Sequence, residues 1–203
     1  MSQIALPLGT GPGASPRRIV VGNANAGAIE ALQRPQDWPF RTAVLTGPPR
    51  AGKSLIAHWF ADAGLGEAID DARLLDETDL FHRWNRAQES ATPLLLIGGA
   101  GEWPVALPDL ASRLGAALHL DIGVPDDAML ADLILAHAEA RGLALGPDAA
   151  AYLVPRCERS HLAVERLVAT IDRLSLERKA PPGLAIWRAA LDELNGESQP
   201  RLL

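Results

Sequence analysis

The sequence predicts an α/β domain with a mostly parallel sheet, followed by a smaller all-helical domain. Two observations support this fold class. Short apolar runs typical of buried strands alternate with helical stretches as far as residue 123, and this order produces parallel strands joined by crossover helices. Beyond Pro125 only helical patterns remain. We therefore expect a flexible tail over residues 1–17, an α/β core over residues 18–123 and a helical domain over residues 124–203.

The elements of the α/β core follow from its apolar patterns. A short apolar run, residues 19–22, ends in a loop, and a helix is expected over residues 26–32 with Asn25 as its N-cap. The expected strands are short apolar runs that end at Gly or loop residues, namely residues 42–46, 93–97 and 117–122. Helices are expected between them over residues 53–63, 76–89 and 107–114.

Four helices are expected after Pro125. Asp126 can cap the first of them, which runs to Arg141, and Gly142 ends it. The third helix begins near Ser160 and carries an apolar stripe at i, i+3, i+4, i+7 spacing. The other two are expected at about residues 147–155 and 184–194.

The acidic composition narrows the classes of function. The formal net charge is −6, with 25 acidic and 19 basic residues, whereas proteins that bind nucleic-acid backbones rely on a basic face. No apolar run approaches the roughly 20 residues that span a bilayer. The single Cys157 cannot form an internal disulfide, which fits a reducing compartment. We expect a cytoplasmic protein without direct DNA binding or membrane insertion.

Residues 47–54 read GPPRAGKS and fit the phosphate-binding pattern G-x-x-x-x-G-K-[ST] at every fixed position. Gly47 and Gly52 let the backbone turn so that its N–H groups point at phosphate oxygens. Lys53 supplies positive charge to the β and γ phosphates, and Ser54 can offer its hydroxyl to Mg²⁺. The pattern predicts a nucleoside di- or triphosphate site formed by Gly47, Pro48, Pro49, Arg50, Ala51, Gly52, Lys53 and Ser54.

Two carboxylates follow the phosphate loop at a short distance in the sequence. Asp70 and Asp71 come directly after the thin apolar pair Ala68 and Ile69. A hydrolytic phosphate loop needs an acidic strand end for Mg²⁺ and for the attacking water. The pair is therefore a candidate for this role, with Asp70 toward the metal ion, and the alternative is two solvated side chains in a loop.

The N-terminal hexapeptide QIALPL, residues 3–8, is apolar and is followed by a Gly- and Pro-rich stretch. No basic residues precede it and its apolar run is too short for a signal peptide. We interpret it as a segment presented outward for a partner, and the alternatives are a disordered tail and an edge strand.

Several of these pieces resemble the DnaA branch of AAA+ proteins. Residues 19–26 resemble the family's N-terminal box, which lines the adenine and here includes Val21, Gly22 and Asn23. The loop GPPRAGKS is similar to its Walker A motif. The stretch LPDLASRL, residues 107–114, resembles box VII, in which the Arg of the S-R pair, here Arg113, is the arginine finger. The helices after Pro125 resemble the AAA+ lid.

With the hexapeptide included, the whole chain resembles the Hda family of DnaA-related regulators. In that family a Gln-x-x-Leu-Pro-Leu segment binds the DNA polymerase III sliding clamp, its beta subunit. The resemblance implies a negative regulator of replication initiation that binds ADP or ATP with Mg²⁺ and uses Arg113 in trans to promote ATP hydrolysis by DnaA. It leaves a homodimer open, and it implies clamp contacts by Gln3, Ile4, Leu6, Pro7 and Leu8.

The chain departs from the family pattern at three places. The strand and helix usual between the phosphate loop and the acidic strand end are largely missing, which leaves room for a sheet that is one strand short. Gly98 and Gly99 replace the polar sensor at the end of the next strand. The sensor 2 Arg aligns near Glu165, and the candidate nucleotide-binding residue Arg166 lies one position later, about 100° around the helix. We expect weak or no intrinsic ATPase activity, and the alternatives are a self-contained P-loop ATPase and a nucleotide-free scaffold at the replisome.

Overall fold

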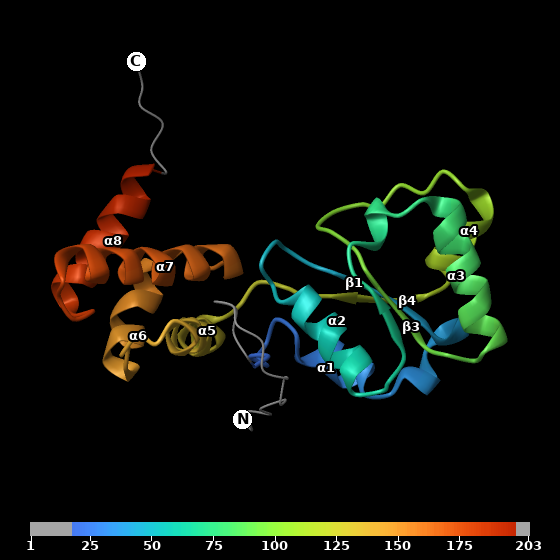
Figure 1. Cartoon of the computed structure of the whole chain (residues 1–203), viewed down its shortest axis with the longest axis horizontal. Coiled ribbons are helices and arrows are strands. Elements are labelled where there is room, and N and C mark those ends of the chain that lie inside the picture. Colours follow the sequence, from blue (N-terminus) through green and yellow to red (C-terminus); the bar gives the residue numbers. More distant parts are fainter. Residues whose placement is uncertain (1–17, 198–203) are drawn as a thin grey trace, which may run out of the picture. The chain divides into compact units, whose positions relative to one another are not determined.

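The computed structural model describes residues 18–197 of the chain. They form two compact units: the α/β unit, Ala24–Gly123, and the helical unit, which combines residues 18–23 with residues 124–197 (Figure 1). The hexapeptide over residues 3–8, with all five expected clamp contacts, lies outside the described residues. Its role therefore stays a prediction.

The α/β unit contains the parallel sheet that the sequence predicts. Its strands are β1 (Thr42–Thr46), β2 (Glu67–Ile69), β3 (Leu94–Ile97) and β4 (Leu118–Asp121), in the order β2-β3-β1-β4. All neighbouring strands pair in parallel. The two inner strands are buried almost throughout, which explains why their sequences are nearly continuous apolar runs. Between β1 and the acidic pair Asp70 and Asp71 the chain forms one helix and the three-residue β2.

The register of the sheet aligns the carboxyl ends of all four strands at one edge. Leu45 pairs with Ile97, Ile69 pairs with Leu96, and the last residues of β1 and β4, Thr46 and Asp121, are partners. The loops that follow the strands therefore meet at this edge. In open α/β sheets the crevice beyond the carboxyl ends of the strands is the usual place for ligands.

Helices cover both faces of the sheet. They are α1 (Ala26–Leu32), α2 (Lys53–Asp62), α3 (Glu77–Glu89) and α4 (Pro108–Gly115). On one face Leu80 of α3 and Leu110 of α4 join Val44 and Leu96 in a buried cluster, whereas α2 contacts β2 and β3, and α1 contacts β4. Figure 1 shows α1 and α2 on one side of the sheet and α3 and α4 on the other. Short 3₁₀ turns lie at Pro35–Asp37, Pro39–Arg41 and Ala72–Leu74.

The expected cap of α1 is wrong in one respect. Asn25 occupies the N-cap position, but its side chain makes no capping hydrogen bond. Its backbone angles, φ −136° and ψ −3°, lie outside the extended region from which a cap side chain normally reaches the helix. Asp76, by contrast, is extended and caps α3 by accepting hydrogen bonds from the N–H groups of Thr78 and Asp79, at 2.8 and 3.2 Å.

The helical unit contains the four helices expected after Pro125. They are α5 (Asp127–Ala140), α6 (Pro147–Leu153), α7 (His161–Arg178) and α8 (Leu184–Glu197), with a 3₁₀ turn at Val154–Arg156. Asp126 caps α5 and Ser160 caps α7, each accepting a hydrogen bond from a backbone N–H of the first turn. Helix α7 packs against both α5 and α8 through the apolar stripe seen in the sequence. No helix in residues 18–197 is long and apolar enough to cross a membrane.

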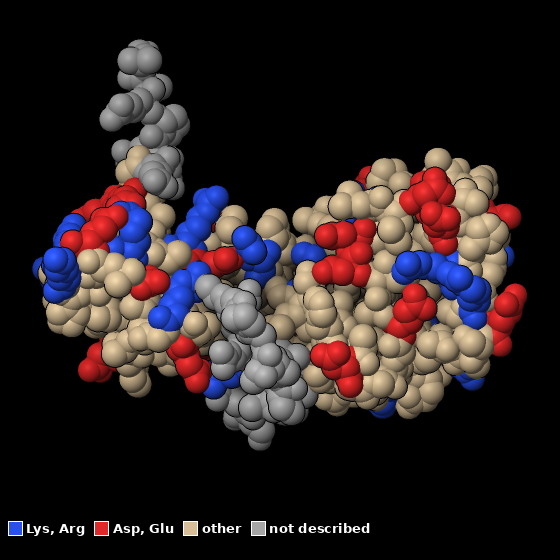
Figure 2. Space-filling model, in the orientation of Figure 1, with Lys and Arg blue, Asp and Glu red and all other residues tan. Residues whose placement is uncertain are grey.

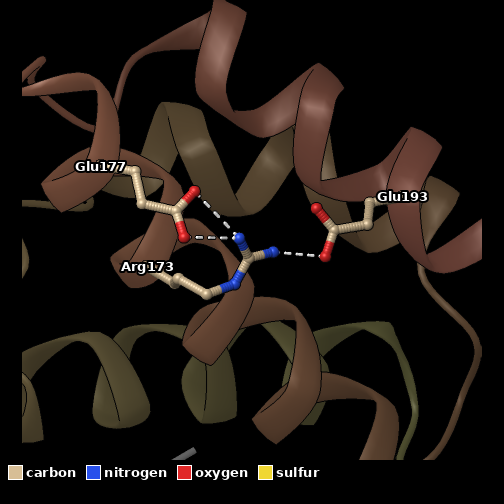
Figure 3. Close-up of polar contacts among 3 residues, drawn as sticks. All are labelled: Arg173, Glu177 and Glu193. Carbon is tan, nitrogen blue, oxygen red and sulfur yellow. Dashed lines mark hydrogen bonds and ion pairs between the residues drawn. The ribbon is translucent and has the colours of Figure 1, made fainter.

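An ion-pair network on the surface joins α7 to α8. Arg173 donates from one nitrogen to both carboxylate oxygens of Glu177, at 2.9 and 3.0 Å, and from the other nitrogen to Glu193 (Figure 3). All three side chains are partly exposed, and pairs of this kind add little to stability in water. The network therefore adds directional contacts to a helix pair that the apolar stripe already holds.

His137 is a buried titratable residue in the core of the helical unit. Its side chain is only 8% exposed, and its Nδ1 atom has no hydrogen-bond partner. Burial lowers the pKa of His137, and the charges of Arg141 and His161 lower it further, whereas the carboxylate of Glu165 acts in the opposite direction. The folded unit therefore favours the neutral imidazole, and unfolding allows it to take up a proton.

We expect the free energy of unfolding to decrease as the pH falls below about 6.5, the ordinary pKa of histidine. The reason is that the unfolded chain then binds more protons than the folded one. His137→Phe should remove most of this decrease, as measured by urea denaturation at pH 7.5 and 5.5. His82→Gln, at an exposed position of α3, serves as a control and should keep the wild-type dependence. An unchanged pH dependence in His137→Phe would contradict the assignment.

Candidate nucleotide-binding site

The phosphate loop joins the end of β1 to the start of α2, at the carboxyl edge of the sheet. Gly47 has φ +146° and Gly52 has φ +80°, values that side chains other than Gly rarely adopt. A Cβ atom on Gly47 would lie 2.8 Å from the Cβ and 3.0 Å from the carbonyl oxygen of Ile122. The loop therefore starts in close contact with the chain that leaves β4, and only Gly fits there.

Lys53, the first residue of α2, is held over this loop. Its ammonium donates hydrogen bonds to the carbonyl oxygens of Gly47 and Pro48, at 2.9 and 2.8 Å. Burial lowers the pKa of Lys53, and three carboxylates, those of Asp70, Asp71 and Asp121, partly offset this effect. These carboxylates favour the charged ammonium, which is the form of lysine that binds phosphate.

The acidic pair lies at the end of β2. The side chains of Asp70 and Asp71 are exposed, and Asp70 accepts a hydrogen bond from the backbone N–H of Asp71 at 3.0 Å. Their charges act on Lys53. Within residues 18–197 no group of three or more His, Cys, Asp or Glu could hold a metal ion by itself. A magnesium ion would therefore have to be shared with phosphate oxygens, and the metal roles of Ser54 and Asp70 stay predictions.

Sequence reasoning missed Asp121 as a residue of this site. Asp121 ends β4, and its carboxylate accepts a hydrogen bond from the hydroxyl of Thr46 at 2.9 Å. The same hydroxyl lies 3.2 Å from the carbonyl oxygen of Leu120. The sequence offered a polar residue near the end of an expected strand, residues 117–122, but it did not show that this strand pairs with β1.

The first part of the N-terminal box, residues 19–23, belongs to the helical unit, and residues 24–26 belong to the α/β unit. The amide nitrogen of Asn23 donates to the carbonyl oxygen of Val124 at 3.1 Å, and its oxygen accepts from the N–H of Asp126 at 2.9 Å. Gly22 lies against Met129, whose side chain would be 2.8 Å from a Cβ at this position. These contacts fix the start of α5, so the Asn23 side chain already has a structural role, and Val21 beside it is half-buried.

Arg166 also lies in the helical unit, on an exposed position of α7. Together with Arg156 and Cys157 it lines a cavity of about 280 Å³ that extends to α8. Burial and the neighbouring Glu158 raise the pKa of the Cys157 thiol to about 11. The thiol is therefore protonated at neutral pH, which disfavours a nucleophilic role.

Arg113 lies near the end of α4 and packs against α3. Its guanidinium carbon is 4.1 Å from the ring centre of Phe81 and 4.3 Å from that of Trp84. One nitrogen donates to the side-chain oxygen of Asn85 at 2.6 Å. The aromatic residues are themselves packed on the core. Sequence reasoning missed these three residues, although their i, i+3, i+4 spacing places them on one face of α3.

Comparisons with known proteins identify the fold of this chain. No protein-family model and no curated protein matches the sequence. Domain III of the replication initiation protein DnaA from Thermotoga maritima is 15% identical with a TM-score of 0.67, and the match covers 85% of this chain and 93% of that one. The RuvB Holliday junction branch migration motor of the same organism is 18% identical with a TM-score of 0.59, over 86% of this chain and 70% of that one.

A third solved structure extends the comparison to a nucleotide complex. The initiator DnaA bound to AMPPCP and single-stranded DNA is 16% identical with a TM-score of 0.59, over 78% of this chain and 65% of that one. At these identities the likeness establishes the fold. The chain has the AAA+ P-loop fold of DnaA and RuvB, with a parallel four-stranded sheet in the described residues.

The contact between Gly47 and Ile122 can be tested by adding one methyl group. Gly47→Ala should lower the free energy of unfolding by about 2 kcal/mol, because the new Cβ meets Ile122 and the backbone is strained at this φ. Gly27→Ala in α1 is the matched control, since its Cβ would meet nothing within 4 Å and Ala favours a helix. Urea denaturation measures both, and equal stability of the two variants would contradict the interpretation.

Proposed function

We propose that this chain is a cytoplasmic, Hda-like regulator of replication initiation that binds ADP or ATP with Mg²⁺ and promotes ATP hydrolysis by DnaA. In this proposal residues 3–8 bind the sliding clamp, the beta subunit of DNA polymerase III, and Arg113 acts on the nucleotide of DnaA. The observation that carries the proposal is the fold shared with DnaA domain III, on which the motif LPDLASRL forms α4. The N-terminal hexapeptide supports the clamp as the second partner.

The phosphate loop would hold the nucleotide through groups that the chain already positions. A bound nucleotide supplies the phosphates, and in the nucleotide complex of DnaA the ligand is AMPPCP. Lys53 lies over the loop carbonyls with its ammonium oriented by two hydrogen bonds. The backbone N–H groups at the start of α2 add the partial positive charge of a helix N-terminus. Ser54 and Asp70 would share the magnesium ion with the phosphates.

Arg113 would act as an arginine finger in trans. A guanidinium placed against a γ phosphate stabilises the charge that spreads over its oxygens in the transition state. The rings of Phe81 and Trp84 and the amide of Asn85 limit the number of conformations open to this side chain. Such restriction lowers the entropy lost when the finger is placed on its target.

Direct DNA binding is not part of the proposal. On the face seen in Figure 2, acidic and basic side chains are interspersed and no extended basic area is present among the described residues. The net charge of −6 points the same way. The proposed partners are proteins. Whether a second copy of this chain is among them is tested by measuring the oligomeric state.

Clamp binding is the first test of this proposal. The full-length chain should bind the purified clamp with a dissociation constant on the order of micromolar, which corresponds to about 8 kcal/mol. Two buried Leu side chains contribute roughly 3–6 kcal/mol before ordering costs, and the other contacts of residues 3–8 must supply the rest. Replacing both Gln3 and Leu6 by Ala should weaken binding at least about tenfold. Surface plasmon resonance measures the affinity, with Thr10→Ala as the matched control. A wild-type chain that does not bind the clamp would remove this part of the proposal.

The finger can be tested separately from clamp binding. Arg113→Lys keeps the charge but loses the planar guanidinium, and it should reduce the stimulation of ATP hydrolysis by DnaA about 10³-fold, as for other fingers acting in trans. Asn85→Ala should cause a smaller loss, because it frees the finger without removing it. The rate of ATP hydrolysis is measured as phosphate release in mixtures of DnaA, the clamp and this chain. Arg86→Lys, at an exposed position of α3, is the control, and full activity of Arg113→Lys would rule out the finger.

A further inference from the structure

Asp121 lies at the base of the phosphate loop. It is the strand partner of Thr46, the residue directly before Gly47. The Thr46 hydroxyl holds its carboxylate at 2.9 Å, and Ile122, the next residue, is packed against Gly47. The side chain is exposed rather than part of the core. A negative charge is thus fixed next to the loop without serving the packing of the sheet.

The charged groups that favour the ammonium of Lys53 at this loop are carboxylates. The carboxylates of Asp70, Asp71 and Asp121, which come from two strand ends, act electrostatically on the ammonium of Lys53. A di- or triphosphate would bring further negative charge to the same place. Like charges repel, and partial screening by solvent weakens this repulsion without removing it.

We propose that Asp121 makes nucleotide binding at this loop depend on a divalent cation. The proposal rests on one part of the proposed function, namely that the loop binds ADP or ATP. Without the cation, the carboxylate of Asp121 repels the phosphates and competes with them for the ammonium of Lys53. With the cation bound to the phosphates, the net charge of the ligand falls and the repulsion is largely offset. Asp121 acts through its charge, since the acidic residues here form no metal cage of their own.

The experiment is equilibrium binding of a fluorescent ADP analogue to the full chain, with Mg²⁺ or with EDTA at constant ionic strength. The wild type should bind at least about tenfold more tightly with Mg²⁺. Asp121→Asn keeps an oxygen that can accept from Thr46 and removes only the charge. It should raise the affinity in EDTA about three- to tenfold and change the affinity in Mg²⁺ less than about twofold.

Two control variants make the result specific. Asp62→Asn removes the same charge at the far end of α2, about 13 Å along the helix from Lys53, and should leave both affinities at wild-type values. Lys53→Ala should abolish binding, which shows that the signal reports this loop. Thermal unfolding of each variant checks that the fold is kept.

The outcomes separate this inference from the proposed function. If Asp121→Asn keeps the wild-type ratio of affinities with and without Mg²⁺, the inference is overturned while the nucleotide site stands. If the wild type binds no nucleotide under either condition, both the nucleotide site and the inference fail. Clamp binding and stimulation of DnaA are measured without this assay, so they can succeed or fail independently.

Discussion

The contact between Gly47 and Ile122 is the constraint on which the rest of the α/β unit depends. It brings the start of the phosphate loop against the chain leaving β4, at a distance that only Gly allows. Because β1 and β4 are parallel and in register, the same contact places Thr46 beside Asp121. From there the loop continues into α2, where the ammonium of Lys53 donates to the carbonyls of Gly47 and Pro48.

Packing on the face of the sheet that α3 and α4 cover determines the position of Arg113. Phe81 and Trp84 are packed against the core, and their remaining ring surface carries the guanidinium. A cation over aromatic rings is stabilised without losing its charge, and the Asn85 oxygen fixes its direction. These contacts tie α4 to α3 and keep the guanidinium charged.

Local patterns predicted the elements well, whereas contacts between elements could not be predicted. The bounds of α1 and β1 match the expectation, β3 is one residue shorter at its start, and β4 is one residue shorter at each end. Burial of β1 and β3 on both faces leaves clear apolar runs in the sequence. The phosphate loop was also predictable, since its chemistry requires fixed residues at fixed spacing. Asp121 was not, because its importance comes from the strand register, which brings together residues 75 positions apart. The missing cap at Asn25 has a similar cause. Its residue type predicts a cap, but its backbone angles prevent one.

The same site combines a well-formed loop with surroundings that are poorly suited to rapid turnover. The loop has its lysine, its glycines and its helix N-terminus, which are the groups that the proposed nucleotide binding requires. Gly98 and Gly99 offer no polar side chain at the end of β3, and the carboxylates near Lys53 are exposed rather than enclosed in a dry pocket, where electrostatic stabilisation would be strong. These surroundings fit the proposal of a site that holds a nucleotide without hydrolysing it rapidly. That balance suits a protein in which the bound nucleotide supports a surface, and the chemistry takes place on a partner.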